Sequence, residues 1–167
     1  MRADRLRVAR QVRGFMPDDD GMALYRAGRW AEAARHLEAF RALTGSVEQH
    51  PVLADCYRAL RRFPKVDALW EELRAASPEP ALLTEGRIVT AGSLAARGDV
   101  RGAIRLLERG PLVPKRSPAE HHLRLWYALA GLYERAGEVP RARELFARIV
   151  HADPTFGDAG ERLGSLS

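Results

Sequence analysis

The stretch WYALAGLYERAGEVPRARELFARIVHADP, residues 126–154, decides how this chain folds. In its first half Trp126, Leu129 and Tyr133 stand three and four residues apart, a spacing that places apolar side chains on one face of an α-helix. Gly137 interrupts the pattern, a second helical pattern follows, and Pro154 comes directly after it. The stretch therefore predicts two helices joined by a tight turn.

The same arrangement of small and large residues recurs four times. A small residue in the second helix of each unit recurs as Ala33, Val66, Ala103 and Ala142, and the large residue four positions later is Leu37, Trp70, Leu107 or Phe146. Nine positions before the small residue lie Leu24, Tyr57, Leu94 and Tyr133, and three earlier lie Gly21, Ala54, Ala91 and Ala130. The turn between the two helices holds Gly28, Arg61, Gly98 or Gly137. Small residues let two helices cross closely, and a single pair cannot bury its own apolar face, so we expect four pairs to stack.

The last unit resembles the tetratricopeptide signature of Trp-x2-Leu-Gly-x2-Tyr, then Ala-x3-Phe, then Pro. Ala130 stands where the signature has Gly. With the turn residue Gly137 counted as an eighth marker, the other seven match in the correct spacing. The resemblance covers roughly residues 14–156. It implies an all-α fold, an α-α superhelix or solenoid of about four helix-turn-helix repeats with capping helices at both ends.

On this interpretation the chain has three parts. Residues 1–16 form a basic N-terminal capping helix, residues 17–156 hold the four repeats (about 14–46, 47–80, 84–117 and 123–156), and residues 157–167 form a C-terminal capping helix that begins near Phe156. Ser117-Pro118-Ala119-Glu120 reads as an N-cap, a first-turn proline and a capping-box glutamate. It predicts a long helix to about Ala136, and Pro78-Glu79-Pro80 predicts another to near Arg97. Residues 110–117 are expected to be a loop.

The composition of the chain is typical of a soluble protein without disulfides. The chain has 167 residues and a net charge of +5, and residues 1–16 contribute five arginines against one aspartate, so the remainder is nearly balanced. Arginine greatly outnumbers lysine and asparagine is absent, a skew typical of a GC-rich, bacterial genome. One cysteine, Cys56, cannot form a disulfide framework and is expected to be a buried, inert thiol. The longest apolar runs are too short for a membrane span or a secretory signal, so we expect a soluble, cytoplasmic protein.

The sequence holds no pattern that predicts catalysis. It has no phosphate-binding Gly-rich loop, no His-Glu-x-x-His helix and no paired cysteines. Of the five histidines only His121 and His122 are close in sequence, and they are expected to lie on a solvated helix face rather than to hold a metal. We therefore expect no enzyme activity, no metal and no cofactor.

The family resemblance implies a binding surface, because the first helices of successive repeats line the concave face of such superhelices. The positions that it assigns to this groove are Tyr25, Arg26, Asp55, Arg58, Ile88, Gly92, Arg124, Tyr127, Gly131 and Glu134. Gly92 and Gly131 either floor the groove for a partner segment or only let first helices approach each other. The Lys and Asn side chains with which some members of the family clamp a chaperone's carboxylate have no counterpart here, since Lys65 and Lys115 fall outside these positions.

Two classes of function follow. The first is a protein–protein interaction scaffold that binds another protein or a peptide segment in the groove. The alternative is a protein associated with nucleic acid or the ribosome through its basic helix, whose candidate residues are Arg2, Arg5, Arg10 and Arg13. An apolar edge at the first helix could also support self-association, and the identity of the partner stays open.

Overall fold

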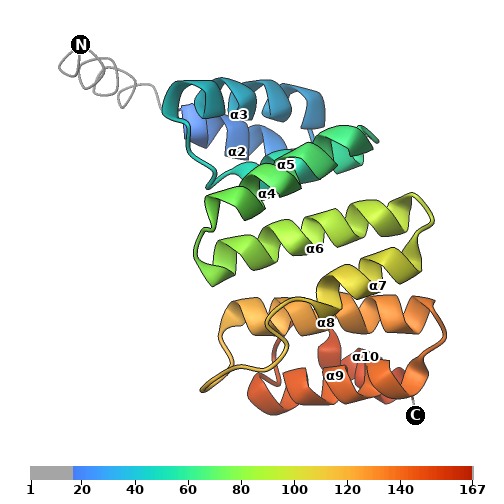
Figure 1. Cartoon of the computed structure of the whole chain (residues 1–167). Coiled ribbons are helices and arrows are strands. Elements are labelled where there is room, and N and C mark those ends of the chain that lie inside the picture. The colour runs from blue at the N-terminus through green and yellow to red at the C-terminus, as the bar shows by residue number, and fades with distance from the viewer. Residues whose placement is uncertain (1–16, 167) are drawn as a thin grey trace. The chain divides into compact units, whose positions relative to one another are not determined.

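The structure is a computed structural model that describes residues 17–166, with side chains from Asp20 onward. Every regular element in this range is a helix (Figure 1). The helices are α2 (Pro17–Arg26), α3 (Trp30–Thr44), α4 (His50–Ala59), α5 (Phe63–Ala76), α6 (Pro80–Ala96), α7 (Val100–Glu108), α8 (Glu120–Arg135), α9 (Val139–Ala152) and α10 (Ala159–Ser165). The prediction of an all-α helical repeat fold is therefore confirmed. The basic helix expected over residues 1–16 lies outside the described residues.

The chain divides into two compact units between Glu72 and Leu73. In the first, described from Pro17, α2 packs against α3 and α3 packs against α4. The side chains that α3 and α4 bury are mostly small or aliphatic: Ala33, Ala34, Leu37, Leu53, Ala54 and Cys56. This unit therefore pairs helices in the way that the repeats predicted.

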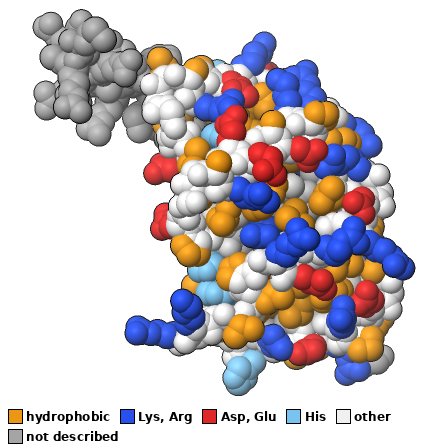
Figure 2. Space-filling model, in the orientation of Figure 1, with side chains coloured by type: hydrophobic (Ala, Val, Ile, Leu, Met, Phe, Trp, Pro, Cys, Tyr) orange, Lys and Arg blue, Asp and Glu red, His pale blue; other side chains and the backbone are white. Residues whose placement is uncertain are grey.

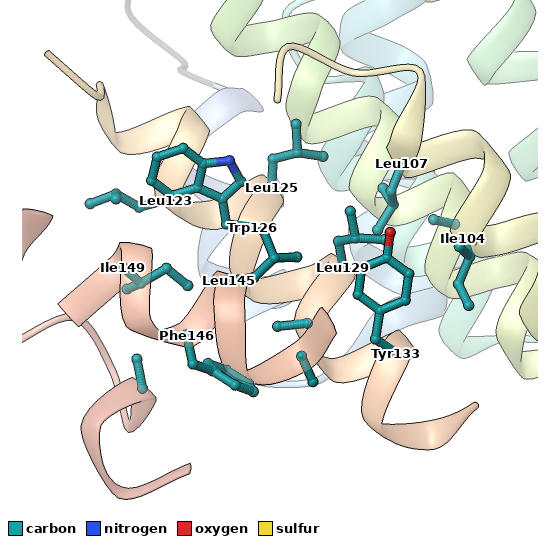
Figure 3. Close-up of a cluster of buried hydrophobic side chains, with 14 of the residues drawn as sticks. Ile104, Leu107, Leu123, Leu125, Trp126, Leu129, Tyr133, Leu145, Phe146 and Ile149 are labelled. Carbon is teal, nitrogen blue, oxygen red and sulfur yellow. The ribbon is translucent and has the colours of Figure 1, made fainter. Parts of the chain in front are cut away.

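The second unit, from Leu73 onward, is a run of packed helices. Each of α6 to α10 contacts the next one along the chain, and α6 also contacts α8, so first helices of neighbouring repeats touch directly. Their buried side chains form one core, in which Trp126, Leu129 and Tyr133 of α8 meet Phe146 and Ile149 of α9 (Figure 3).

The repeated small positions of the second helices are fully buried. Ala33, Val66, Ala103 and Ala142 are each 0% exposed. Val66, the largest of the four, is buried as completely as the alanines. The alignment of the repeats therefore identified four fully buried positions, as expected where paired helices cross closely.

The turn between paired helices is left-handed at all four repeats. The φ angle is +74° at Gly28, +89° at Gly98 and +79° at Gly137. Arg61, the exception in sequence, adopts the same conformation with a φ of +57°. A side chain with a Cβ is strained in this region, so Arg61 takes the geometry of its glycine counterparts at a cost.

The Arg61→Gly variant is expected to be more stable than Arg61→Ala by about 1 kcal/mol. Both variants lose the guanidinium that lies 5.1 Å from the centre of the Phe63 ring. Only glycine adopts the left-handed backbone conformation without strain. The order should reverse at Arg35, which is exposed within α3, where glycine costs about 1 kcal/mol relative to alanine. Urea unfolding of the four variants measures both differences. The same order at both positions would contradict the strain at Arg61.

The start of α8 differs from its prediction. The helix begins at Glu120, with Ala119 as N-cap, so the prediction of Ser117 as the capping residue is wrong. The His122 side chain supplies the cap instead, since its Nδ1 accepts a hydrogen bond of 3.0 Å from the Ala119 N–H. A neutral imidazole nitrogen can accept a hydrogen bond from a backbone N–H as a carboxylate does, although the usual capping-box pattern has Glu or Gln at this position. His122 is also half-buried rather than solvated.

The other predicted boundaries are close to the observed ones. The long helices are confirmed as α6 and α8, and residues 109–119 connect α7 to α8 without a helix. The Trp126 indole N–H donates to the Leu112 carbonyl at 2.9 Å, which ties this loop to α8. The last helix starts at Ala159 rather than near Phe156, because turns occupy residues 154–158.

Candidate functional site

In the first unit, three of the predicted groove residues form one polar cluster. The Tyr25 hydroxyl donates to Asp55 Oδ2 at 2.6 Å, and Arg58 Nε donates to Asp55 Oδ1 at 2.7 Å. α2 supplies the tyrosine, and α4 supplies the carboxylate and the guanidinium one helical turn apart, so the cluster joins the first helices of two repeats. Arg26, next to Tyr25, is exposed.

The cluster of the first unit keeps its tyrosine neutral. Burial, and then the hydrogen bond to the Asp55 carboxylate, raise the pKa of Tyr25 to about 12. The Tyr25 hydroxyl therefore remains a proton donor at neutral pH, and Asp55 remains the acceptor for both neighbours. Such an arrangement can bind a partner through hydrogen bonds.

In the second unit, the exposed part of the predicted groove is an ion pair between first helices. Arg124 of α8 donates through Nε and Nη2 to the two carboxylate oxygens of Glu85 of α6, with an Nη2–Oε2 distance of 2.8 Å. The Arg124 side chain is 47% exposed and that of Glu85 is 30% exposed. Ile88 and Gly92 follow on α6 at helical spacing and are half-buried, and Ile88 packs against the core.

The far end of α8 is engaged by the chain's own last helix. Tyr127 donates to Asp158 Oδ1 at 2.6 Å, and Arg162 Nη2 of α10 donates to Glu134 Oε2 at 2.8 Å. The Arg162 guanidinium lies 5.3 Å from the Tyr127 ring centre, and a Cβ added to Gly131 would lie 3.6 Å from Arg162 Nη2. Three predicted groove residues, Tyr127, Gly131 and Glu134, therefore face Asp158 and α10 rather than open solvent.

A second polar contact recurs between repeats, and the sequence comparison missed it. The Tyr57 hydroxyl donates to Glu38 Oε1 of the preceding second helix at 2.7 Å, and the Lys65 ammonium lies 4.9 Å from the Tyr57 ring centre. Tyr133 repeats this with Glu108 at 2.7 Å and with the Arg141 guanidinium 5.3 Å from its ring. In both, the glutamate directly follows the large residue of one repeat and the cation directly precedes the small residue of the next.

This offset is visible in the sequence, so an alignment of polar as well as apolar positions could have found the contact. Burial and the bond to Glu108 raise the pKa of Tyr133 to about 12, which leaves it a donor at neutral pH. The third repeat has Leu94 at the tyrosine position, where no such donor exists. The contact is a packing feature of two repeats, and it lies at positions other than those predicted to meet a partner.

One histidine is buried in the first unit. His50 is 3% exposed and its Nε2 lies 2.9 Å from Glu72 Oε2, while Arg41 donates to the other oxygen of the same carboxylate. The hydrogen bond with His50, and then the bonds from Arg41, lower the pKa of Glu72, and burial opposes them. The group joins α3, α4 and α5 within this unit and explains why a histidine is tolerated in its core.

A family model described as tetratricopeptide repeat matches residues 123–166, which span α8, α9 and α10. This segment of the chain is a tetratricopeptide repeat. Proteins built from these repeats generally mediate protein–protein interactions and are typically non-enzymatic scaffolds.

A solved structure shares the fold of this chain. It is a crystal structure of nearly identical TPR-like repeats, assigned to a kinesin light chain of Podosopora anserina. The TM-score is 0.67 at 21% sequence identity, over 93% of this chain and 85% of that one. At this identity the likeness concerns the fold alone. No curated protein gives a significant match to the chain.

The predicted groove residues of this chain are thus of two kinds. Tyr25, Asp55, Arg58 and Arg124 sit in partly exposed polar clusters of first helices, whereas Tyr127, Gly131 and Glu134 meet residues of the C-terminal segment. Arg2, Arg5, Arg10 and Arg13 lie outside the described residues, so the alternative site stays a prediction.

Two further observations concern the described residues alone. Within residues 17–166, no helix is both long enough and apolar enough to cross a bilayer. In the same range, no group of three or more His, Cys, Asp and Glu side chains is placed to hold a metal ion. Cys56 is 0% exposed, and burial raises the pKa of its thiol to about 11, as expected of a packing residue.

Proposed function

We propose that this protein is a non-enzymatic scaffold of the bacterial cytoplasm, which binds a segment of another protein through the first helices of its repeats. The observation that supports this most directly is the Arg124–Glu85 pair. It is a bidentate ion pair between two first helices, and its side chains remain partly exposed. Exposed ion pairs contribute little to stability, about 0–1 kcal/mol, so packing alone gives little reason for the pair.

The pair has the chemistry of a recognition site. A partner carboxylate can replace Glu85 on the planar guanidinium, and a partner cation can replace Arg124 on the carboxylate. Ile88 lies one turn from Glu85 and offers a partly buried aliphatic surface beside the charges. Arginine beside apolar surface is a common composition of binding hot spots. In the first unit, Arg58, Asp55 and Tyr25 offer the same kinds of donor and acceptor.

The test compares capture of partners from nuclease-treated native lysate by three folded proteins: wild type, Arg124→Glu and Arg148→Glu. Arg148 is the matched control, because it is also partly exposed and also pairs with a glutamate, Glu144 of α9, but it lies on a second helix. Circular dichroism checks the helices of each protein. Arg124→Ile is a second variant that removes the charge without repulsion from Glu85.

We expect wild type and Arg148→Glu to capture the same protein partner. Arg124→Glu should capture about tenfold less of it, since the loss of a recognition arginine costs at least about 1.4 kcal/mol. Equal capture by all three proteins would contradict the site. Capture that is lost when residues 1–13 are deleted, and that survives Arg124→Glu, would favour the basic N-terminal segment instead.

A further inference from the structure

Helix α7 and its C-cap residue, Arg109, carry a row of arginines that packing does not use. Arg101, Arg105 and Arg109 follow one another at intervals of four residues, and all three are exposed. Residues four apart lie on one face of a helix, about 6 Å apart along its axis. Among residues 17–166 none of the three guanidiniums has an ion pair or a side-chain hydrogen bond. We call Arg101, Arg105 and Arg109 the arginine row.

The acidic residues nearest in sequence are engaged elsewhere. Asp99 is the N-cap of α7, and its Oδ1 accepts from the Gly102 N–H at 2.8 Å. Glu108 accepts from the Tyr133 hydroxyl at 2.7 Å and lies 3.6 Å from Arg141. The positive charge of the row is therefore not neutralised by its own helix.

Two features of the row are unfavourable in the isolated chain, although the C-terminal positions of Arg105 and Arg109 suit the helix dipole. Like charges four residues apart repel each other. Arg101 also lies in the first turn of α7, where the helix dipole disfavours a cation. Nearby charge adds to the effect, since burial, and then repulsion from Arg74 and Arg109, lower the pKa of Arg87. An arrangement that is unfavourable in the isolated chain becomes favourable when an anion binds it.

The other repeats show that the fold does not require this row. The positions equivalent to Arg101, Arg105 and Arg109 are Ala31, Arg35 and Ala39 in the first repeat, Pro64, Ala68 and Glu72 in the second, and Pro140, Glu144 and Arg148 in the fourth. In the fourth repeat two of these residues form an internal ion pair of 2.6 Å. The unpaired row belongs to the third repeat.

Apolar surface accompanies the charge. Val113, four residues after Arg109, is 80% exposed, and Leu112 is held in place by the Trp126 indole. Figure 2 shows Lys and Arg side chains gathered over the region where α7 lies in Figure 1, with hydrophobic side chains beside them. A partner can therefore combine ion pairs with a small apolar contact.

We propose that the arginine row is a second binding surface, which takes an acidic protein segment with carboxylates one helical turn apart. A helix with glutamates every fourth residue repeats the 6 Å spacing of the row, and each carboxylate can meet one guanidinium. This surface lies on a second helix, so it is distinct from the first-helix site around Arg124 and does not depend on it.

Protein is favoured over nucleic acid because the aromatic side chains of the second unit are already engaged. Trp126 is buried, Tyr127 donates to Asp158 and Tyr133 donates to Glu108. Proteins that bind single-stranded nucleic acid combine basic grooves with rings on which bases stack. The row offers guanidiniums and aliphatic side chains, which suit an acidic amphipathic segment.

The experiment measures fluorescence anisotropy of three labelled probes on the full chain at low and physiological salt. The first probe is a helical peptide with four glutamates at four-residue spacing, and the second is a permuted peptide that spreads the same glutamates around the helix. The third probe is a single-stranded oligonucleotide of equal charge. The test variant is Arg101→Glu, Arg105→Glu, Arg109→Glu. The matched control, Arg35→Glu, Arg62→Glu, Arg143→Glu, changes three other exposed arginines and has the same net charge.

The first peptide should bind wild type more tightly than the permuted peptide does. The row variant should bind the first peptide about tenfold more weakly than wild type does, as expected for the loss of three partly exposed ion pairs. The control should retain binding. A matching Gln triple at the row, which removes the charges without reversing them, replaces the Glu triple if circular dichroism shows lost helix.

Three results would overturn the proposal. Equal weakening by the row variant and the control would show that net charge alone attracts the peptide. Equal binding of the two peptides would show that the spacing of the glutamates does not matter for binding. Tighter binding of the oligonucleotide through the same arginines would make the row a nucleic-acid surface. Loss of lysate partners with Arg124→Glu, without loss of the peptide, separates this surface from the proposed first-helix site.

Discussion

Replacing Phe146 with alanine is expected to lower the free energy of unfolding by about 3–5 kcal/mol, the usual cost of removing a buried phenylalanine. Phe146 is 0% exposed in the core of the second unit (Figure 3). Its ring meets the edge of Tyr127 at a centre-to-centre distance of 5.9 Å, and the Arg162 guanidinium lies 4.7 Å from it. Alanine would leave a cavity and remove the ring that supports contacts from α8 and α10.

Urea unfolding followed by circular dichroism measures the Phe146→Ala effect. Phe146→Leu is the matched variant, since leucine fills most of the volume, and it should cost less than about 1.5 kcal/mol. A loss below about 1 kcal/mol for the alanine variant would mean that the site collapses around the missing ring, which contradicts the close packing inferred for this unit.

Replacing Ala130 with leucine should destabilise the protein by about 1–3 kcal/mol, through overpacking rather than through a cavity. Ala130 is 0% exposed on α8, in the same core as Ala142 of α9, which is also 0% exposed. Three additional carbon atoms can enter only if the two helices separate or leucine adopts a strained rotamer.

Ala147→Leu is the matched control for the overpacking prediction, because Ala147 is exposed on α9 and should change stability by less than about 0.5 kcal/mol. Thermal and urea unfolding report both values. If Ala130→Leu is as stable as wild type, the recurrent small residue does not mark a close crossing, and the basis for aligning the four repeats at this position is lost.

The apolar part of the fold could be predicted from the sequence because helix packing imposes a strict periodicity. Ala103 and Ala142 are small where helices cross, and both are fully buried. The left-handed turns could be predicted where glycine marks them. At Arg61 the sequence carried no such mark, because the surrounding helices fix the chain path and a non-glycine residue accepts the strain.

The polar part could be predicted less well, because partners of long side chains depend on which helices become neighbours. The sequence suggested Tyr127 and Glu134 as groove residues, yet Asp158 and Arg162 engage them. The pairing of Arg124 with Glu85 joins residues 39 apart, a separation that only the packed first helices explain. The histidine cap of α8 escaped prediction because acidic residues are the usual signal at that position.

The reactivity of the single cysteine of the chain, Cys56, can report the opening of the first unit. Cys56 is fully enclosed between helices, and burial suppresses its thiolate, so a thiol reagent in solution can react with it only after that unit opens. When the reagent modifies the open state faster than the unit recloses, the labelling rate equals the opening rate. When reclosing is faster than modification, the labelling rate reports the fraction of molecules that are open. The opening of the first unit can therefore be followed on the native chain, with no introduced cysteine and no denaturant.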